Sequence, residues 1–404
     1  MDFYTLDNFN FKGKRVLLRV DINSPIKNNK VMPNARLTEN SKTIKELINK
    51  KAKLTIIAHQ GRLNGKDYLS LKQHSKILSK LTKENIQYID DLIGNKAINK
   101  IKSLKEGEAI LLKNTHSLKE DNIYNITKKQ AYNSKLVKKL QPLFDYFIND
   151  AFSSSHRSEI SIIGFNKIPN IAGRVMEKEL KNIHNIHKKA KHPYIFFMGG
   201  LKIEDSFHLI NNLLKQKKVD KILITGLFGI LALIDKYQID KKELIKNPKL
   251  KKTYKKVKYF LNKYPDKFEL PIDIAFIDKN KRKEIVINPI TIDSILVYDL
   301  NIDIGKRTID HYKQILSKAK MIYIKGPPGA YENKLLEKGT KEILKTISNS
   351  KAYSLAGGGH TSQAIDKFIK KNKFSYISLA GGALIDYLAG EKLPGVESLS
   401  KCST

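Results

Sequence analysis

Arginine is rare in this chain, so its positions are informative. The 404 residues include 75 lysines and arginines, of which only eight are arginine. Lysine supplies a point charge, whereas the planar guanidinium grips carboxylate or phosphate through two hydrogen bonds, so an arginine kept in such a chain indicates a site that needs this geometry. Because six of the eight precede residue 180, we expect an anion site in the first half: Arg15, Arg19, Arg36, Arg62, Arg157 and Arg174.

Histidine, carboxylate and amide side chains share loops with some of these arginines. A lone histidine is more often a packed or surface residue than a functional one. Here, however, each histidine stands one or three residues before an arginine, in loops that follow apolar runs. Such a collection suits a small acid that carries both phosphate and carboxylate. Its members are Asp21, Asn23, His59, Arg62, His156 and Arg157.

Four glycine loops follow apolar runs in the second half. They are Gly-Gly-Leu-Lys at 199–202, Gly-Pro-Pro-Gly at 326–329, Gly-Gly-Gly-His-Thr at 357–361 and Gly-Gly-Ala at 381–383. Glycine lets backbone amides approach a phosphate, and a helix that starts there adds its dipole. None of the four ends in the Gly-Lys-Ser/Thr of a P-loop. A tight turn could explain one such loop, but four at one sheet edge predict a nucleotide lying across that edge.

Strands that alternate with amphipathic helices must position these loops. Apolar runs rich in β-branched and aromatic residues are separated by segments with apolar residues three and four apart. This alternation predicts an α/β fold with parallel sheets, whose ligands lie beyond the carboxyl ends of the strands. The predicted strands are 15–22, 53–59, 108–113 and 144–150 in the first half, and 193–199, 221–225, 321–326, 351–357 and 376–381 in the second.

Length and composition limit the remaining choices. A chain of 404 residues exceeds the size of one hydrophobic core, so two domains are expected. The single cysteine, Cys402, allows no internal disulfide and fits a reducing cytosol. The sequence shows neither a signal-peptide pattern nor an apolar run of roughly 18 residues, which predicts a cytoplasmic protein without membrane association.

The net charge of +35 raises nucleic acid as a partner from another class. The lysines, however, are spread over every segment, and the chain lacks an aromatic-studded basic motif and a zinc-ligand pattern. A compositional bias toward lysine is therefore favoured, and nucleic-acid binding is not expected to be the main role. Salt-dependent binding without turnover would favour that alternative. The lysine-rich stretch at 239–258 is expected to be an exposed helical region.

Ten motifs, in order along the whole chain, resemble those of the phosphoglycerate kinase family. His360 and Arg174 resemble the archaeal branch of that family. The motifs are RVDINSP, HQGR, NDAFSSSHRSEISIIGF, AGRVMEKEL, MGGLKIEDS, LPIDIAF, DIGKRT, KGPPGAYE, GGGHT and GEKLPGVESL.

The resemblance implies an organisation and an activity. Two doubly wound, Rossmann-like domains would face each other across a cleft and be joined by a helix near 176–189. Residues 1–183 would bind phosphoglycerate, residues 184–388 would bind nucleotide, and a tail at 389–404 would return to the first domain. The reaction would be reversible phosphoryl transfer from 1,3-bisphosphoglycerate to ADP, giving 3-phosphoglycerate and ATP, with magnesium bound to the nucleotide. The protein would be a monomer or a homodimer.

The resemblance also assigns residues. Arg36 and Lys202 would act on the transferring phosphoryl group, and no residue is assigned as a metal ligand because His360 departs from the family pattern. The substrate site would comprise Asp21, Asn23, Arg36, His59, Arg62, His116 and Arg157, and the nucleotide site Gly200, Lys202, Pro327, Glu332, Gly357, Gly358, Gly359, His360 and Thr361.

Four positions depart from the family pattern. His116 stands where the family has a substrate arginine, and phosphoglycerate affinity would then depend on pH unless His116 points elsewhere and Lys113 or Lys119 supplies the charge. Ser206 stands for a second nucleotide-binding lysine, Lys325 for an asparagine, and His360 for an aspartate that contacts magnesium. These departures leave open a kinase-like protein without activity, which a coupled assay with 3-phosphoglycerate and Mg-ATP distinguishes from an enzyme.

Overall fold

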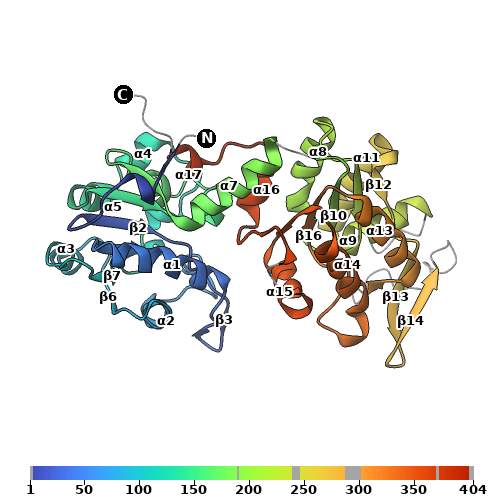
Figure 1. Ribbon diagram of the computed structural model, residues 1–404, viewed down its shortest axis with the longest axis horizontal. Helices are drawn as coiled ribbons and strands as arrows, with labels where there is room; N and C mark the ends of the chain where they lie inside the picture. Colours follow the sequence, from blue (N-terminus) through green and yellow to red (C-terminus); the bar gives the residue numbers. More distant parts are fainter. Residues whose placement is uncertain (1–2, 189–190, 239–245, 287–301, 370–372, 400–404) are drawn as a thin grey trace. The chain divides into compact units, whose positions relative to one another are not determined.

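The computed structural model describes residues 3–188, 191–238, 246–286, 302–369 and 373–399. Contacts divide the chain into two units (Figure 1). Unit 1 comprises Met1–His184 and Glu391–Thr404, and unit 2 comprises Asn185–Gly390. The division falls within helix α7 (Arg174–Lys188). The expected division of labour, in which the first domain binds phosphoglycerate and the second binds nucleotide, remains a prediction.

Unit 1 contains a sheet of seven strands whose neighbouring pairs are all parallel. Along β2, Val16 and Leu18 pack into one hydrophobic core while Leu17 packs into another. Both faces of the sheet are therefore buried, which explains why the strand reads as a continuous apolar run. The strand order is β1 (Tyr4–Thr5), β9 (Asn170–Ala172), β8 (Tyr146–Asn149), β2 (Arg15–Arg19), β5 (Lys53–Ile57), β7 (Ala109–Leu111), β6 (Ile86–Tyr88).

Helix α1 (Ala35–Asn49) shows how sequence sets these elements locally. Asn34 caps its start, since the Asn34 side-chain oxygen accepts the Leu37 N–H at 3.1 Å. Leu37, Ile44 and Leu47 recur at helical spacing and are fully buried in the core. The cap therefore fixes where the helix begins, directly before Arg36.

Unit 2 contains a sheet of six strands, again with only parallel pairs. The chain builds β11 and β12 on one side of β10 and then returns to add β16, β17 and β18 on the other. The same reversal occurs in unit 1, where β2 has β5 on one side and β8 on the other. The strand order is β12 (Phe268–Glu269), β11 (Lys221–Ile224), β10 (Tyr194–Met198), β16 (Met321–Lys325), β17 (Tyr353–Gly357), β18 (Tyr376–Ile377).

The predicted α/β class with doubly wound parallel sheets is confirmed, and all nine predicted strands overlap observed ones. Ligands of such sheets bind where the strand order reverses, which is between β2 and β8 in unit 1 and between β10 and β16 in unit 2. The sequence did not predict a small antiparallel sheet, β14 (Lys281–Val286), β13 (Asp273–Asp278), β15 (Asp303–Ile304), or the hairpin β3 (Ile26–Lys27), β4 (Lys30–Val31).

Helices connect the strands in both units (Figure 1). The expected lysine-rich helical region corresponds in part to α11 (Pro248–Lys263), and residues 239–245 lie outside the described residues. The C-terminal segment belongs to unit 1, where the Gly395 N–H donates to the Ser155 carbonyl oxygen at 2.9 Å. The other helices are α2 (Lys72–Thr82), α3 (Asn95–Lys102), α4 (Lys128–Tyr132), α5 (Lys135–Leu140), α6 (Ile160–Ile163), α8 (Phe207–Lys215), α9 (Gly226–Lys236), α13 (Lys306–Lys318), α14 (Lys338–Asn349), α15 (Gly359–Phe368), α16 (Gly382–Leu388) and α17 (Pro394–Glu397).

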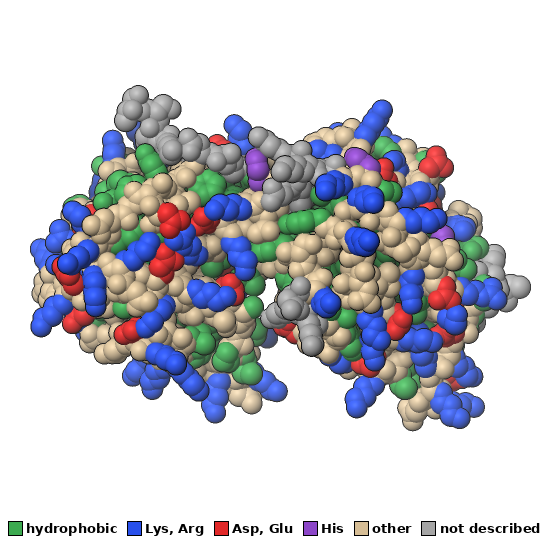
Figure 2. Space-filling view, viewed as in Figure 1, with side chains coloured by type: hydrophobic (Ala, Val, Ile, Leu, Met, Phe, Trp, Pro, Cys, Tyr) green, Lys and Arg blue, Asp and Glu red, His purple; other side chains and the backbone are tan. Residues whose placement is uncertain are grey.

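The distribution of basic side chains on the surface agrees with a general bias of the composition toward lysine. Lysine and arginine side chains are spread over both units on the face drawn in Figure 2, without forming a single stripe. Among the described residues, none of the helices has the length and apolar character that crossing a membrane requires.

Candidate active site

Asp21 lies at the carboxyl edge of the unit 1 sheet, at the reversal between β2 and β8. Its Oδ1 accepts the Asn23 N–H at 3.0 Å, and the Ser153 hydroxyl, which follows β8, donates to its Oδ2. Arg36 Nη1 lies 3.1 Å from the same Oδ2. Burial acts to raise the pKa of the Asp21 carboxyl, but the Arg36 charge and the Ser153 hydrogen bond hold that pKa below its ordinary value. The ionised carboxylate therefore fixes Arg36 at the start of α1.

His59 follows β5 and is a neutral member of the site. Burial and the neighbouring Arg19 charge lower the pKa of His59 to about 3. Arg19 Nη2 lies 2.8 Å from His59 Nδ1. Because a guanidinium only donates, His59 Nδ1 must accept, and the ring proton is on Nε2. His59 can thus offer an N–H to a substrate but no charge.

An ion pair between Arg19 and Glu159 lies beneath these residues. Arg19 Nη2 and Glu159 Oε2 are 3.1 Å apart, and neither side chain is exposed. Arg19 also donates through Nε to the Ser161 hydroxyl at 3.1 Å. Breaking such a buried pair costs roughly 3–5 kcal/mol, because the remaining charge has no partner. Sequence reasoning assigned no site role to Arg19, Glu159 or Ser153, although an arginine inside an apolar strand of a lysine-rich chain was a usable signal for Arg19.

His116 lies next to this ion pair and is fully buried. Its ring stacks on His59, with centroids 4.4 Å apart and planes at 18°. His116 Nδ1 is 2.6 Å from the Gly61 carbonyl oxygen, so the ring donates there, and His116 Nε2 is 3.9 Å from Glu159 Oε1. Direct contact with a substrate phosphate stays a prediction, and to make it the ring would have to leave Gly61 and Glu159.

His59, His116 and Glu159 form a buried group with mutual distances that a metal ion could use. However, the Glu159 carboxylate already contacts two guanidinium groups, at 3.1 Å for Arg19 and 3.3 Å for Arg157. A divalent cation would be repelled by both arginines. The group therefore serves better as a scaffold that orients the loops of an anion site.

The remaining substrate-site candidates lie on loops tied to this scaffold. The Gly61 N–H donates to Asn23 Oδ1 at 3.1 Å, so the loop that carries the exposed Arg62 is bonded to the loop after β2. Arg157 is partly exposed, and its guanidinium carbon lies 5.5 Å from the Tyr124 ring centroid. His156 stands beside Arg157, and burial lowers the pKa of His156 below its ordinary value.

In unit 2, the glycine loops after β10 and β16 interlock. The Gly199 N–H donates to the Lys325 carbonyl oxygen at 2.9 Å, and the Gly200 N–H donates to the Pro327 carbonyl oxygen at 2.9 Å. Gly326 has a φ of +82°, and a Cβ there would lie 2.2 Å from the Gly199 carbonyl oxygen. Only glycine permits this close approach of two backbones.

The third glycine loop leads into α15. Gly358 precedes the helix with a φ of +95°, and a Cβ on Gly359 would meet no atom within 4 Å. Open space thus lies beside the first residue of a ten-residue helix, whose N-terminal N–H groups favour an anion. Thr361 is buried, and its Oγ1 accepts the Gly326 N–H at 2.8 Å, which ties this loop to the one after β16. Gly357 ends β17 in register with Lys325.

The other nucleotide-site candidates are exposed. Lys202 follows Gly200 in the first loop, His360 follows Gly359 in the third, and Glu332 lies five residues after Pro327. Their side chains are accessible to a ligand at this edge of the unit 2 sheet.

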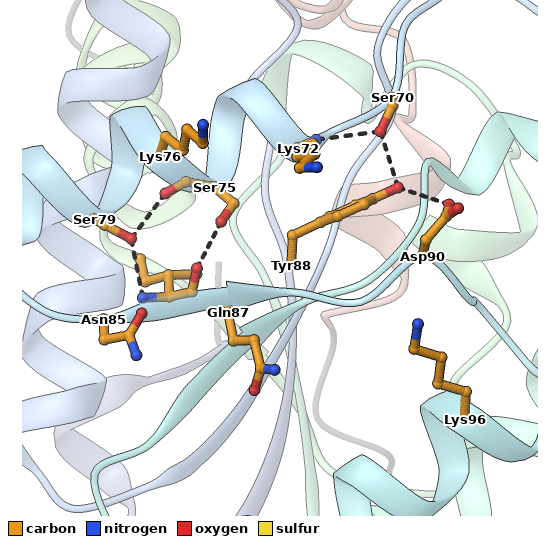
Figure 3. A pocket seen from close by; sticks show the side chains of 11 residues that line it. Ser70, Lys72, Ser75, Lys76, Ser79, Asn85, Gln87, Tyr88, Asp90 and Lys96 are labelled. Carbon is orange, nitrogen blue, oxygen red and sulfur yellow. Dashed lines mark hydrogen bonds between the residues drawn. The ribbon is translucent and has the colours of Figure 1, made fainter.

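A depression on unit 1 lies apart from these candidates (Figure 3). It measures about 700 Å³ and is lined by residues of α2, of β6 and of the segments beside them. Tyr88 is one of its lining residues; its hydroxyl accepts a hydrogen bond from the Ser70 hydroxyl and donates one to Asp90 Oδ1, at 3.0 Å each. None of the candidate site residues lines it.

A parallel α/β fold with glycine loops at the strand reversal of unit 2, and an arginine–carboxylate pair at that of unit 1, is typical of enzymes that act on phosphorylated small molecules. The family model for phosphoglycerate kinase matches residues 6–391. The chain belongs to the phosphoglycerate kinase family.

Individual relatives agree over nearly the whole length. The phosphoglycerate kinase of Methanothermus fervidus is 38% identical over 406 residues, covering 99% of this chain and 97% of that protein. The phosphoglycerate kinase of Methanococcus maripaludis is 39% identical over 410 residues, covering 99% and 98%. The crystal structure of phosphoglycerate kinase from Pyrococcus horikoshii matches with a TM-score of 0.89 and 36% identity, covering 98% of both chains.

These findings confirm the predicted family, its archaeal-type branch and the class of activity. The protein is a phosphotransferase of glycolysis and gluconeogenesis that exchanges a phosphoryl group between 1,3-bisphosphoglycerate and ADP. The possibility of an unrelated nucleic-acid-binding protein is thereby set aside.

Proposed function

We propose that unit 1 binds phosphoglycerate and unit 2 binds ADP or ATP, and that Arg36 and Lys202 act on the transferring phosphoryl group. The observation that carries this division is the Asp21–Arg36 pair at the strand reversal of unit 1. A guanidinium held by a carboxylate, with the N–H of a neutral His59 nearby, suits a small anion. The glycine loops of unit 2 suit a polyphosphate.

The substrate's two charged ends would be divided among the arginines of unit 1. The exposed Arg62 and the partly exposed Arg36 and Arg157 offer planar guanidinium groups that match carboxylate or phosphate. Asp21 and Asn23 would accept from the substrate hydroxyl or orient the surrounding loops. In this arrangement the buried Arg19–Glu159 ion pair, with His116 beside it, holds the loops in place.

Phosphoryl transfer needs positioning and charge stabilisation more than covalent participation by the protein. Lys202 would neutralise an oxygen of the transferring group, and the α15 N-terminus would stabilise a neighbouring phosphate. Arg36 would stabilise the same group from the substrate side. Neither a protein nucleophile nor a general base is required, because the substrate carboxylate itself is the acceptor in the reverse direction.

Magnesium is the cofactor expected with the nucleotide. The loop at 357–361 contains no carboxylate; its side chains are the exposed His360 and Thr361, whose Oγ1 already accepts the Gly326 N–H. Oxygen ligands for Mg²⁺ would therefore come mainly from the nucleotide phosphates and water, in line with its preference for keeping several waters. When bound, the ion neutralises phosphate charge. His360 is not proposed as a ligand.

A coupled assay tests this function. Purified protein should form ADP from Mg-ATP only when 3-phosphoglycerate is present, and a chelator should abolish turnover. ATP consumption independent of 3-phosphoglycerate would contradict the proposal. We further propose a cytoplasmic location, in keeping with the glycolytic reaction, and a monomer or homodimer, which sedimentation would decide.

A further inference from the structure

Lys325 ends β16 at the centre of the proposed nucleotide site. Its register partners are Met198 on β10 and Gly357 on β17, the strands that lead into the first and third glycine loops. The Lys325 carbonyl oxygen accepts the Gly199 N–H at 2.9 Å. The backbone of Lys325 is therefore fixed between two loops that are proposed to bind nucleotide, at the point where the strand order reverses.

The side chain of Lys325 is half-buried. Its ammonium group donates to the Ser206 hydroxyl, and Ser206 is fully buried in the short helix η6 (Glu204–Ser206). Burial lowers the pKa of Lys325 to about 8, although Asp205 and Glu204 act in the opposite direction. These two carboxylates are the charged groups that face it among the described residues.

A purely structural role, in which Lys325 only holds η6 through Ser206, does not explain why a charged side chain is used here. Among the described residues, no carboxylate lies within ion-pair distance of Lys325, and Glu204 pairs instead with Lys249 at 3.5 Å. A neutral amide could bond Ser206 equally well, without the cost of partly desolvating a charge. The chain has solvated lysines in abundance, where no such cost arises. A partly buried cation among loops that favour anions is explained if an anion completes its coordination.

We propose that Lys325 binds a phosphate group of the nucleotide, with Ser206 positioning its ammonium group. The inference rests on the proposed function, because it requires the nucleotide to occupy the glycine loops of unit 2. A phosphate beside the ammonium group favours the charged form. Nucleotide binding should therefore draw a proton onto Lys325 when the pH lies near or above its pKa.

Calorimetric titration of the full-length protein with MgADP measures both affinity and proton uptake. Comparing two buffers with different ionisation enthalpies at pH 8 should show net proton uptake by the wild-type protein, since part of the Lys325 population is then unprotonated. Uptake should vanish near pH 6.5, where the free protein already carries the proton.

Variants identify the residue responsible. Lys325→Met should weaken MgADP binding roughly 10- to 100-fold and abolish the uptake at pH 8. Ser206→Ala should weaken binding roughly 3- to 10-fold, keep the proton uptake and leave the KM for 3-phosphoglycerate unchanged. The matched control is Lys320→Met, which removes an exposed lysine just before the opposite end of β16 and should change neither quantity.

The outcomes separate the two proposals. If the wild-type protein binds MgADP but Lys325→Met binds within twofold of it with the same uptake, the role of Lys325 is refuted and the proposed function stands. If the wild-type protein neither binds MgADP nor turns over, both fail. Should Lys325→Met fold poorly, as judged by circular dichroism, absence of proton uptake in the wild-type protein alone overturns the inference.

Discussion

Arg36 Nη1 lies 3.1 Å from Asp21 Oδ2, and the same carboxylate oxygen accepts the Ser153 hydroxyl. One buried carboxylate thus joins the loop after β2, the start of α1 and the segment after β8. The guanidinium is held in position before any substrate arrives, which lowers the cost of ordering it during the reaction.

Arg36→Lys is expected to lower kcat by roughly 100-fold or more, the scale seen when one stabiliser of the transition state is lost. Lysine keeps the charge but cannot bond Asp21 and a phosphoryl oxygen with one planar group. Steady-state kinetics in the direction of ADP formation provides the measurement. Arg307→Lys, at an exposed position of α13, is the control, and full activity of Arg36→Lys would show that the fork is not needed.

Lys202→Met should lower kcat on a similar scale, roughly 100-fold, if Lys202 contacts the transferring group. A residue that binds only the ground-state nucleotide would instead raise the KM for ATP with little change in kcat. Lys334→Met removes another exposed lysine of unit 2 and should have little effect. Unchanged kcat with raised KM in Lys202→Met would restrict Lys202 to nucleotide binding.

Because His116 is buried, its replacement should affect stability and not the pH dependence of substrate binding. Because its ring contacts the Gly61 carbonyl and faces Glu159, His116→Gln is expected to leave the pH dependence of phosphoglycerate affinity between pH 6 and 8 as in the wild-type protein. The variant should lose roughly 1–3 kcal/mol of unfolding free energy, the cost of disrupting a buried polar contact. Binding titrations at both pH values and urea denaturation measure these effects. If phosphoglycerate affinity depended less on pH in His116→Gln than in the wild-type protein, His116 would contact the substrate phosphate directly.

The sequence predicted the repeated part of the fold well. Strands buried on both faces, such as β2, β5, β10 and β16, read as continuous apolar runs and were found. The two-residue strands β1 and β12 were not predicted, whereas β7 and β18, which are also short, were found because a predicted apolar run extends beyond each of them. The antiparallel β14 is largely polar and solvent-facing, so it shows no apolar alternation.

The site was predictable where glycine or a rare arginine marked it. Contacts between distant segments left no such trace: Ser153 meets Asp21 across 132 positions, and Arg19 meets Glu159 across 140. The burial of His116 likewise depends on Gly61, 55 positions away. Residue types alone could not decide whether His116 faced solvent or the interior, because both environments accept an imidazole.

Arg174 joins three elements of unit 1 through carboxylates. Its guanidinium donates two hydrogen bonds to Asp7, at 2.6 and 2.8 Å, and two to Glu46, at 2.7 and 2.8 Å. It also donates one to Glu177 at 2.8 Å. A lysine at position 174 cannot form paired hydrogen bonds with both carboxylates, so Arg174→Lys should lower the free energy of unfolding. The loss should be roughly 1–2 kcal/mol, because the network is partly exposed. The difference in unfolding free energy between the variant and the wild-type protein should be smaller in 1 M salt, where the Debye length is about 3 Å. Equal stability of the two proteins in urea at low salt would contradict this.

Asp150 offers a test of stability against pH. Its Oδ1 accepts the Val175 and Met176 N–H groups at 2.7 and 3.1 Å, at the start of α7. Burial raises the pKa of Asp150 to about 6, although Thr43 and these N–H groups act to lower it. The side chain is therefore harder to ionise in the folded protein than in the unfolded chain.

The sign of the effect follows from this difference. Below about pH 4 the carboxyl is protonated in both states, and its favourable contribution is fully present. As the pH rises from about 4 to about 6, the unfolded chain ionises first, and that contribution is lost. The loss amounts to roughly 3 kcal/mol for a shift of about two units.

Asp150→Asn keeps an oxygen acceptor for Val175 and Met176 but does not titrate. Its stability relative to the wild-type protein should therefore rise by up to roughly 3 kcal/mol between pH 4 and pH 7. Urea denaturation followed by circular dichroism across this range gives the comparison, and it suits a chain without tryptophan. Asp67→Asn, at an exposed position of unit 1, controls for the general effect of removing a carboxylate. Parallel pH curves for Asp150→Asn and the wild-type protein would show that Asp150 titrates alike in the folded and unfolded states.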